Sequence, residues 1–409
     1  MTRHGALTLI AGARVLKPDG RFYEETVILE GARILALEAE TPGALLLNHD
    51  DVEVINAEGA LLTPGLIDLH INGAFGCDFN AAPIAEIQRA LRLLAARGVT
   101  SVAPTVITAA TMDMLTAINT LEETIHQARP DLCRMIAIHV EGPYISARYR
   151  GAHPAEDIPE SIGIEELRAF TSPHVRIMTL APERDPQGLK IQYLTEKGVR
   201  VNAGHTNAGS DEITRAVSQG VSGVTHLYNA MRPFHHRDPG VIGATLAIPQ
   251  LYAEIIADGV HVHPTALQAA VRAKGLNRIM LVSDAMALAG LPEGSQCVFA
   301  GQTVTLRRGE ARNEEGNLAG AAFLLDDCIR RLVKSRTLGF EQALTMASAT
   351  PAEYLGRSED LGRIAPGCLA DLVLWDAATL TAKATWVDGK LVYEADAALN
   401  RGLSRAALS

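Results

Sequence analysis

Eight short apolar segments alternate with amphipathic segments through the middle of the chain, and this alternation restricts the folds that the chain can adopt. The eight segments, read as strands, are GLIDLHIN (65–72), VTSVAPTVIT (99–108), MIAIHVEG (135–142), VRIMTLAPE (175–183), VRVNAGHT (199–206), GVTHLYNA (223–230), LYAEIIADG (251–259) and IMLVSDA (279–285). Between several of them lie helix-like segments, such as IAEIQRALRLLAARG and SDEITRAVSQG, which end at glycine as helices commonly do. Strands that alternate with helices pair in parallel through crossover connections. Eight such units predict an α/β fold, a (β/α)8 TIM-like barrel.

The two ends of the chain have a different character, because both are rich in short β-type segments. LTLIAGARVL, ETVILEGARILALEAE and VEVINAEGALLTPG precede the barrel, and ADLVLWD and KATWVDGKLVYEA follow it, with a hairpin turn at Asp388-Gly389. We therefore expect a small β-sandwich domain built from residues 1–62 and 366–409, around a catalytic barrel over residues 63–365. After the eighth strand, CVFAGQTVTLRRGEARNEEG predicts an inserted β-hairpin before the helix AAFLLDDCIRRLVK.

Composition and charge exclude several classes of protein. The 409 residues are 47% hydrophobic and 21% charged, which is typical of a globular protein, and the net charge of -10 argues against a nucleic-acid or anionic-membrane partner. The cysteines are scattered and form no C-x-x-C pair, which suits a reducing compartment. No segment is typical of a signal peptide or a transmembrane helix. We therefore expect a cytoplasmic protein.

Five polar residues fall at or near the C-terminal ends of predicted strands: Glu141, His205, His226, Asp258 and Asp284. In a barrel these ends converge on the face that carries the catalytic loops. A lone histidine in such a place is usually a packing residue, but a carboxylate with two imidazoles is a known hydrolytic metal set that leaves a position open for water. A bound divalent ion lowers the pKa of that water and polarises a scissile carbonyl. The sequence thus predicts a metal site at Glu141, His205 and His226.

Asp284 ends the apolar segment IMLVSDA, where an unpaired carboxylate would be costly to bury. It is either a structural residue bonded to backbone amides or a general base that takes a proton from water and returns it to the leaving amine. On the first strand, His70-x-Asn72 stands where an H-x-H would supply ligands for a second ion. Because the neutral amide of Asn72 is a weak ligand, we expect one ion, with His70 as a residual ligand or a residue behind the ligands.

The loop MRPFHHRDPGVIG, after the sixth strand, concentrates positive charge at Arg232, His235, His236 and Arg237. Arginine suits the bidentate recognition of phosphate or carboxylate, which an otherwise acidic protein lacks. On composition alone, an exposed basic loop explains the same residues equally well.

Taken together, these segments resemble the successive motifs of the N-acetylglucosamine-6-phosphate deacetylases, which are members of the amidohydrolase superfamily. The motifs that carry the resemblance are PGLIDLHINGAFG, HVEGPYIS, GAHP, NAGHTNA, THLYNAM, RDPG, IADGVHVH and LVSDAM. The resemblance runs from about residue 59 to 290, and LAGAA and GRIAPGCLADLVLWD extend it to the C-terminal β segments. Each motif is short, but their number and order are specific.

The resemblance implies that Glu141, His205 and His226 bind one divalent ion, with Zn2+ expected and Fe2+ or another divalent ion as the alternative, and that Asp284 is the catalytic base and acid. Some members of the family have two histidines on the first strand and two metals, and others have neither, so that His70-x-Asn72 is intermediate. The resemblance also implies substrate contacts by Ala152, by His153 near the acetamido group, by Asn229, Ala230 and His261 near the sugar phosphate, and by Arg237 at the phosphate of a neighbouring subunit. A homodimer with composite active sites follows from the last of these contacts.

The reaction implied is hydrolysis of N-acetyl-D-glucosamine 6-phosphate to D-glucosamine 6-phosphate and acetate, in amino-sugar catabolism or recycling. One alternative is another deacetylase, for example one acting on the galactosamine 6-phosphate derivative. A second is a cyclic amidase such as a dihydroorotase, but these commonly carry a carboxylated lysine between two metals, and none of the eight predicted strands ends in lysine. A third is a catalytically silent barrel that senses sugar phosphates, which would not need the residues of a water-activating metal site.

Overall fold

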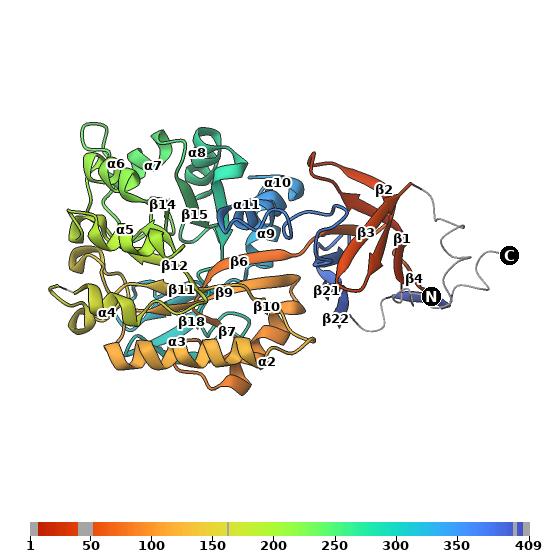
Figure 1. Ribbon diagram of the computed structural model, residues 1–409, viewed down its shortest axis with the longest axis horizontal. Coiled ribbons are helices and arrows are strands. Elements are labelled where there is room, and N and C mark those ends of the chain that lie inside the picture. Colours follow the sequence, from red (N-terminus) through yellow and green to blue (C-terminus); the bar gives the residue numbers. More distant parts are fainter. Residues whose placement is uncertain (1–6, 40–51, 162, 396–398, 404–409) are drawn as a thin grey trace.

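The computed structural model describes residues 7–39, 52–161, 163–395 and 399–403. Figure 1 shows two parts, a large barrel with surrounding helices and a smaller β domain at one end, and the first and last described strands of the chain both lie in the β domain. Within the described residues, no helix is long and apolar enough to cross a membrane.

The barrel contains the eight predicted strands. They are β6 (Leu66–Ile71), β9 (Val99–Ile107), β11 (Ile138–Glu141), β12 (Val175–Leu180), β13 (Arg200–Ala203), β14 (Val221–Val224), β15 (Tyr252–Ile256) and β16 (Ile279–Val282). They pair in parallel and in chain order, and the short strand β10 (Arg134–Met135) pairs with β9. The first and eighth strands meet through the backbone N–H of Asp284, which donates to the carbonyl of His70 at 2.9 Å. The prediction of a (β/α)8 barrel is therefore confirmed.

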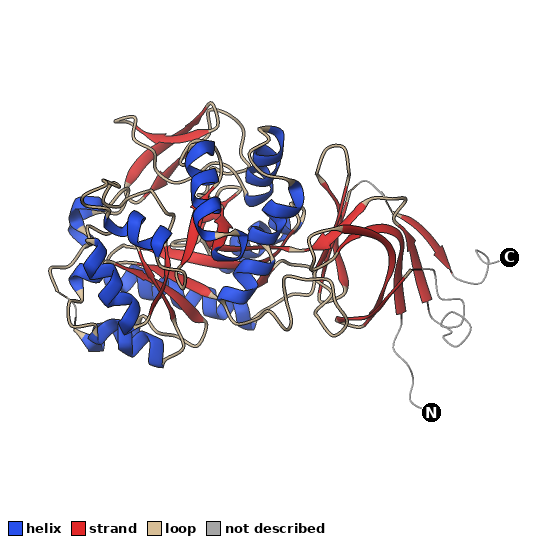
Figure 2. Cartoon of the chain, turned by 90° about the horizontal axis from the view of Figure 1, so that it is seen from above, coloured by secondary structure: helices blue, strands red, loops and turns tan. Residues whose placement is uncertain are grey.

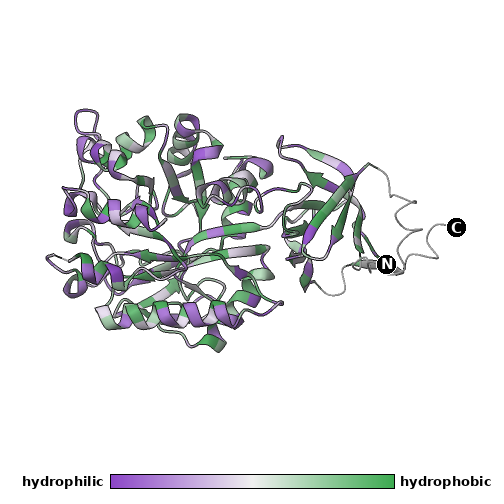
Figure 3. Ribbon diagram, in the orientation of Figure 1, coloured by the Kyte–Doolittle hydropathy of each residue, from purple (hydrophilic) through white to green (hydrophobic). Residues whose placement is uncertain are grey.

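Helices cover the outside of the barrel (Figure 2). They are α2 (Ile84–Ala95), α3 (Thr111–His126), α4 (Ile164–Ala169), α5 (Leu189–Glu196), α6 (Ser210–Gln219), α7 (Gly240–Ala247), α8 (Pro264–Lys274), α9 (Leu325–Lys334), α10 (Phe340–Ala347) and α11 (Ala349–Tyr354). Their sequences are amphipathic: α2 buries Ile87, Leu91 and Leu94 on the face that the barrel covers. The purple and green residues along the helices of Figure 3 show this pattern. Gly220 ends α6 with a φ of 128°, as the sequence predicts for a helix terminus.

Both ends of the chain build one nine-stranded sheet that forms the β-sandwich domain. Its strands are β1 (Leu7–Leu16), β2 (Phe22–Glu30), β3 (Arg33–Glu38), β4 (Val52–Asn56), β5 (Leu61–Pro64), β20 (Leu372–Trp375), β21 (Ala382–Val387), β22 (Lys390–Glu394) and β23 (Asn400–Leu403). β5 pairs with both β1 and β20, so that it joins the two ends of the chain. The hairpin β21–β22 turns at Asp388-Gly389, as predicted. Residues 1–6, 40–51, 396–398 and 404–409 of the expected domain lie outside the described residues.

The insert after the eighth strand is larger than the hairpin that the sequence suggests. It forms a three-stranded antiparallel sheet of β17 (Gln296–Phe299), β18 (Gln302–Arg307) and β19 (Glu310–Asn313). The third strand exists because Arg308-Gly309 makes a second tight turn, in which both residues have positive φ. The sheet packs Phe299 and Val304 against Met286 and Leu288, which follow β16. The insert therefore lies at the end of the barrel where the strands finish.

Candidate metal and active site

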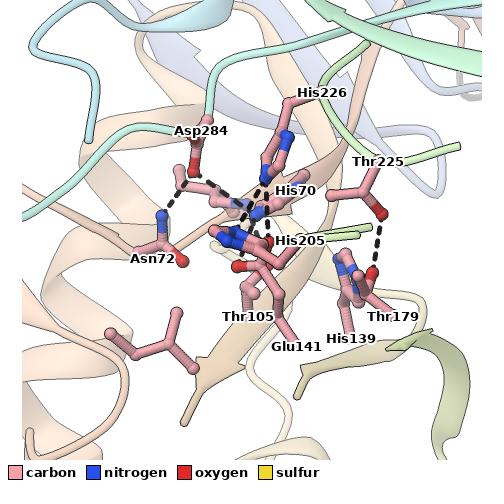
Figure 4. A network of polar contacts seen from close by, with 12 residues as sticks. His70, Asn72, Thr105, His139, Glu141, Thr179, His205, Thr225, His226 and Asp284 are labelled. Atoms are coloured by element: carbon pink, nitrogen blue, oxygen red, sulfur yellow. Dashed lines mark hydrogen bonds and ion pairs between the residues drawn. The ribbon is translucent and has the colours of Figure 1, made fainter. Parts of the chain in front are cut away.

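Three polar side chains meet at the mouth of the barrel from three different strands. Glu141 is the last residue of β11, and His205 and His226 each lie two residues beyond the ends of β13 and β14. All three are buried. Figure 4 shows the two imidazole rings and the carboxylate pointing toward a common centre. The sequence prediction that these residues come together is correct.

The spacing of the three ligand atoms fits a divalent ion. Nε2 of His226 lies 3.0 Å from Oε1 of Glu141 and 3.1 Å from Nε2 of His205, and the latter nitrogen lies 3.2 Å from the same oxygen. For a tetrahedral ion with bonds of about 2.0–2.1 Å, ligand atoms lie roughly 3.3–3.4 Å apart. Two imidazole nitrogens face each other here, beside one carboxylate oxygen. A cation at the centre can bind all three atoms at once, which a single hydrogen atom cannot do. The residues present therefore fit a metal site.

The second nitrogen of His205 fixes the direction of the first. Nδ1 lies 2.9 Å from the carbonyl oxygen of Tyr149, and because a carbonyl only accepts, this nitrogen carries the hydrogen. Nε2 then presents its lone pair to the common centre, as in many metal sites. The charges and hydrogen bonds of the neighbouring histidines act on Glu141 as well. Burial opposes its charged form, but His70, His205 and His226 outweigh burial and hold the pKa of Glu141 well below its ordinary value.

The first-strand residues lie on the other side of Glu141. Nε2 of His70 is 3.2 Å from Oε2 of Glu141 and 3.3 Å from Oδ1 of Asp284. The amide of Asn72 donates to the same Asp284 oxygen at 2.7 Å. Asn72 therefore positions Asp284 through a hydrogen bond. Its place in the H-x-H pattern predicted only that it would be a weak metal ligand. Asp284 is held by side chains at the metal site, so the alternative of a purely backbone-bonded residue does not describe it.

His153 completes this side of the pocket. It lies between η1 (Ala147–Tyr149) and η2 (Ala155–Asp157), is buried, and has its Nε2 3.7 Å from Oε2 of Glu141. Burial lowers the pKa of His153 to about 3. The ring is therefore neutral near pH 7, and it can donate a hydrogen bond without carrying charge.

Asp258 has a different role from the other strand-end residues. It lies two residues beyond β15, where it accepts from the ring of His261 at 2.7 Å and from the backbone N–H groups of Val260 and His261 at 2.8 Å. Burial disfavours the charged imidazole, but Asp258 outweighs burial and raises the pKa of His261. Asp258 thus favours the charged form of His261 at the rim of the pocket.

A cavity of about 190 Å³ connects these residues. It is lined by Asn72, Ile107, Glu141, Gly151, Ala152, His153, His205, His226, Asn229, Ala230, His261, Asp284, Phe299, Leu318 and Gly320. The metal set lies at one part of the lining, and Asn229, Ala230 and His261 form another part. The expected substrate-binding residues, except Arg237, therefore line one cavity with the expected ligands.

The backbone is strained where the cavity residues are presented. His205, His226, Ala230 and Asp284 have positive φ values of 47°, 31°, 49° and 48°. Residues other than glycine rarely adopt this region, and such residues cluster at functional sites. The strain turns these side chains from the ends of the strands into the cavity.

The basic loop after β14 stays outside the cavity of this chain. Arg232 pairs with Asp238 at 2.5 Å, and Arg237 is exposed and contacts the ring of His236 at 2.9 Å. His235 and His236 stack on each other with ring centroids 4.3 Å apart. Within one chain, Arg232, His235, His236 and Arg237 therefore do not line the cavity.

The sequence analysis did not single out several residues in or near the cavity, which are Ile107, Gly151, Glu254, Phe299, Leu318 and Gly320. Phe299 and Leu318 reach the cavity from the insert, and no pattern in an irregular segment predicts this. Glu254 lies fully buried on β15, where it contacts His70. The sequence does mark Glu254 as unusual, because it is the one acidic residue inside the apolar segment LYAEIIA.

Comparison with known proteins agrees with this geometry. Residues 61–392 match the model of the "Amidohydrolase family". The chain belongs to the amidohydrolase family. It is 35% identical over 337 residues to an N-acetylglucosamine-6-phosphate deacetylase from Vibrio furnissii, a match that covers 82% of this chain and 83% of the relative. It is 38% identical over 344 residues to an N-acetylgalactosamine-6-phosphate deacetylase from Shewanella sp. (strain ANA-3), covering 82% and 84%.

The chain also resembles a solved structure that contains a ligand. A mutant N-acetyl-D-glucosamine-6-phosphate deacetylase from Mycobacterium smegmatis, in complex with N-acetyl-D-glucosamine-6-phosphate, superimposes with a TM-score of 0.83 at 30% identity. The match covers 95% of this chain and 100% of that chain. Both the barrel and the β domain are therefore shared with an amidohydrolase of this type.

Proposed function

We propose that this amidohydrolase removes the acetyl group of N-acetyl-D-glucosamine 6-phosphate, giving D-glucosamine 6-phosphate and acetate in amino-sugar catabolism or recycling. The observation that carries the proposal is the meeting of Glu141, His205 and His226 in one cavity with Asp284. Relatives with this named activity, matched over most of both chains, support the choice of substrate.

Glu141, His205 and His226 would hold one divalent ion, which lowers the pKa of a water molecule and polarises the amide carbonyl. Asp284 takes the proton of the attacking water on its carboxylate and returns it to the leaving amine. Asn72 keeps that carboxylate in place through its 2.7 Å hydrogen bond. A neutral His153 donates to the carbonyl oxygen, where negative charge develops during the attack.

The nature of the ion is part of the proposal. Two imidazole nitrogens and one carboxylate oxygen at tetrahedral spacing suit Zn2+, and Fe2+ or another divalent ion is the alternative. Asn72 presents to Asp284 its amide nitrogen, which does not bind cations, and its neutral amide oxygen is a weak ligand. This contact supports one ion per chain.

The phosphate end of the substrate would lie beside Asn229, Ala230 and His261. The contact with Asp258 raises the pKa of His261 and so favours the positively charged ring beside the phosphate. We further propose a homodimer in which Arg237 reaches the phosphate bound to the neighbouring subunit. Its exposure in the single chain, away from the chain's own cavity, is consistent with a role of this kind. A cytoplasmic location stays a prediction.

A second candidate substrate is N-acetyl-D-galactosamine 6-phosphate. The relative from Shewanella with that named activity is 38% identical to this chain, and the N-acetylglucosamine-6-phosphate deacetylase from Vibrio furnissii is 35% identical, so identity does not separate the two substrates. The two substrates differ only in the direction of one hydroxyl group, which neither the metal site nor the phosphate contacts distinguish.

Acetate release from a panel of substrates tests the proposal. The panel contains both epimeric 6-phosphates and the two sugars without phosphate, each assayed with metal-loaded protein and with His226→Gln protein. We expect the highest kcat/KM for N-acetyl-D-glucosamine 6-phosphate, and a loss of activity in the variant. A higher kcat/KM for the galacto epimer would replace the substrate. Absence of acetate release from every member of the panel would refute the deacetylase function.

A further inference from the structure

Three apolar side chains line the catalytic cavity, and none of them has a part in the chemistry described so far. Ile107 comes from the end of β9, Phe299 from β17, and Leu318 from the segment after β19. Ile107 and Phe299 are 4% and 5% exposed, and both belong to the hydrophobic cluster that joins the insert to the barrel. Leu318 is partly exposed and directly precedes Ala319 of that cluster. The insert therefore brings an apolar wall into a cavity whose metal and proton-transfer residues are polar.

This wall of Ile107, Phe299 and Leu318 begins across the barrel from the residues proposed to hold the phosphate. Ile107 ends β9, the second of the eight barrel strands, and Asn229 follows β14, the sixth. In a closed barrel of eight strands, the second and the sixth strand are opposite each other. Glu141, at the end of the third strand, pairs with Ile107 in parallel register. The metal residues, which come from the third, fifth and sixth strands, therefore lie between the wall and the phosphate side.

Hydrogen bonds hold the backbone of Ile107 in place at the cavity. The side chain of Asn80, in the connection between β6 and α2, accepts from the N–H of Ile107 at 3.0 Å and donates to its carbonyl oxygen at 3.0 Å. Phe299 is held by packing against Met286 and Leu288, which follow the eighth strand. A bound group therefore meets a surface that is already in position, which favours selection by shape.

The shape of the proposed substrate directs its acetyl methyl group toward this wall. A secondary amide is almost always trans, so the methyl group and the sugar carbon lie on opposite sides of the C–N bond. The acetamido group and the carbon that carries the phosphate are likewise on opposite sides of the sugar ring. With the carbonyl group at the metal site and the phosphate beside Asn229 and His261, the methyl group therefore points away from the phosphate side. An apolar group is most stable against an apolar surface, which the wall supplies there.

We propose that Ile107, Phe299 and Leu318 form the acyl pocket, which makes the enzyme select the acetyl group over longer acyl groups. The inference rests on the proposed function, because it needs the amide carbonyl at the metal site and the phosphate at the other end of the cavity. One methylene group more than a hydrophobic pocket can hold changes selection by about ten- to two-hundredfold. The wall thus determines which N-acyl derivatives of D-glucosamine 6-phosphate are substrates.

Leu318 closes the acyl pocket toward a second cavity. That cavity has a volume of about 620 Å³ and contains polar side chains in its lining, among them Arg150, Gln302 and Asn313. Ala152 and Leu318 line both this cavity and the catalytic one, so they stand between the two. Shortening Leu318 to alanine should therefore join the acyl pocket to the second cavity and leave room for a longer acyl chain.

Competition between two substrates measures this selection. N-acetyl- and N-butyryl-D-glucosamine 6-phosphate are mixed at equal concentrations, and the initial ratio of butyrate to acetate released gives the ratio of the two kcat/KM values. Both substrates meet the same molecules, so the ratio does not depend on how much of the protein is folded or loaded with metal. The wild type should release mainly acetate. Leu318→Ala and Phe299→Leu should each raise the butyrate-to-acetate ratio by about tenfold or more.

Val304→Ala is the matched control. Val304 lies on β18, is buried in the same hydrophobic cluster, and does not line the cavity. Its replacement removes apolar contacts from the insert, so it should lower thermal stability and leave the butyrate-to-acetate ratio unchanged. A second measurement needs no turnover: calorimetry gives the dissociation constants of both substrates for proteins that also carry Asp284→Asn. Leu318→Ala should strengthen binding of the butyryl compound relative to the acetyl compound by a similar factor.

The proposal is overturned if neither Leu318→Ala nor Phe299→Leu shifts the butyrate-to-acetate ratio by more than about threefold, or if Val304→Ala shifts it as far as they do. A wild type that hydrolyses both substrates equally well would also overturn it. A wild type that releases neither acid would refute the proposed function instead. The dissociation constants would then still decide whether the wall selects the length of the acyl group.

Discussion

Replacing Asp284 by asparagine should remove most turnover while leaving the metal site in place. The carboxylate lies beside the metal residues, and its oxygen accepts from Asn72 at 2.7 Å. The amide oxygen of an asparagine can accept the same hydrogen bond at nearly the same volume, so the local structure should persist. The amide cannot take or return a proton near pH 7. General acid–base catalysis contributes about 10²–10⁴-fold, which corresponds to about 3–5 kcal/mol of the activation free energy.

The assay is steady-state acetate release, with metal content measured on the same preparations. Asp284→Asn should lower kcat by about 10²–10⁴-fold, with metal content and KM near those of the wild type. Asp258→Asn is the matched control, because Asp258 also lies two residues beyond a strand but orients His261. That control should raise KM more than it lowers kcat. A fall in kcat of less than about tenfold for Asp284→Asn would refute the proton-transfer role.

Three further predictions concern the phosphate end and the domain contact. The pKa of His261 is raised, so the ring is charged at lower pH and loses its charge as the pH rises through that pKa. KM for the phosphorylated sugar should then increase with pH in the wild type but not in His261→Gln. Parallel profiles of KM against pH in the two proteins would contradict this. Arg237→Ala should raise KM for the phosphorylated sugar more than for the unphosphorylated one, and equal changes would exclude a phosphate contact. Arg134 joins the barrel to the buried Asp371 at 2.8 Å and is itself only partly buried. Arg134→Met should lower the free energy of unfolding by about 1–3 kcal/mol, measured with urea, because it leaves the carboxylate without its charged partner, and no measurable loss would contradict this.

The barrel could be predicted because its signal is repeated along the chain. Eight buried strands alternate with helices, and this period needs no long-range information. The metal-binding residues could be predicted from the same strand order, since the C-terminal ends of the parallel strands of a barrel converge on one face. The order of the strands does not predict the direction in which each side chain points. The positive φ values of His205, His226 and Asp284 aim these side chains into the cavity, and no local pattern in the sequence specifies them.

Contacts between distant segments were the part that the sequence did not reveal. Asn72 could be recognised as a poor metal ligand, but its hydrogen bond to Asp284 depends on how the first and eighth strands meet. Glu254 could have been noticed as an acid in an apolar strand, but its partners lie on two other strands. The insert gave a signal for turns and strands, whereas the placement of Phe299 in the cavity depends on packing against residues after β16.

The metal content of the purified chain tests the central claim most directly. The wild type and His226→Gln, purified alike, are analysed by mass spectrometry of the elements after removal of loosely bound ions. Removing one of three protein ligands from a site of this kind should abolish retention, so we expect about one divalent ion per wild-type chain and almost none in the variant. Equal metal content in both proteins would contradict the assignment of Glu141, His205 and His226 as the metal site.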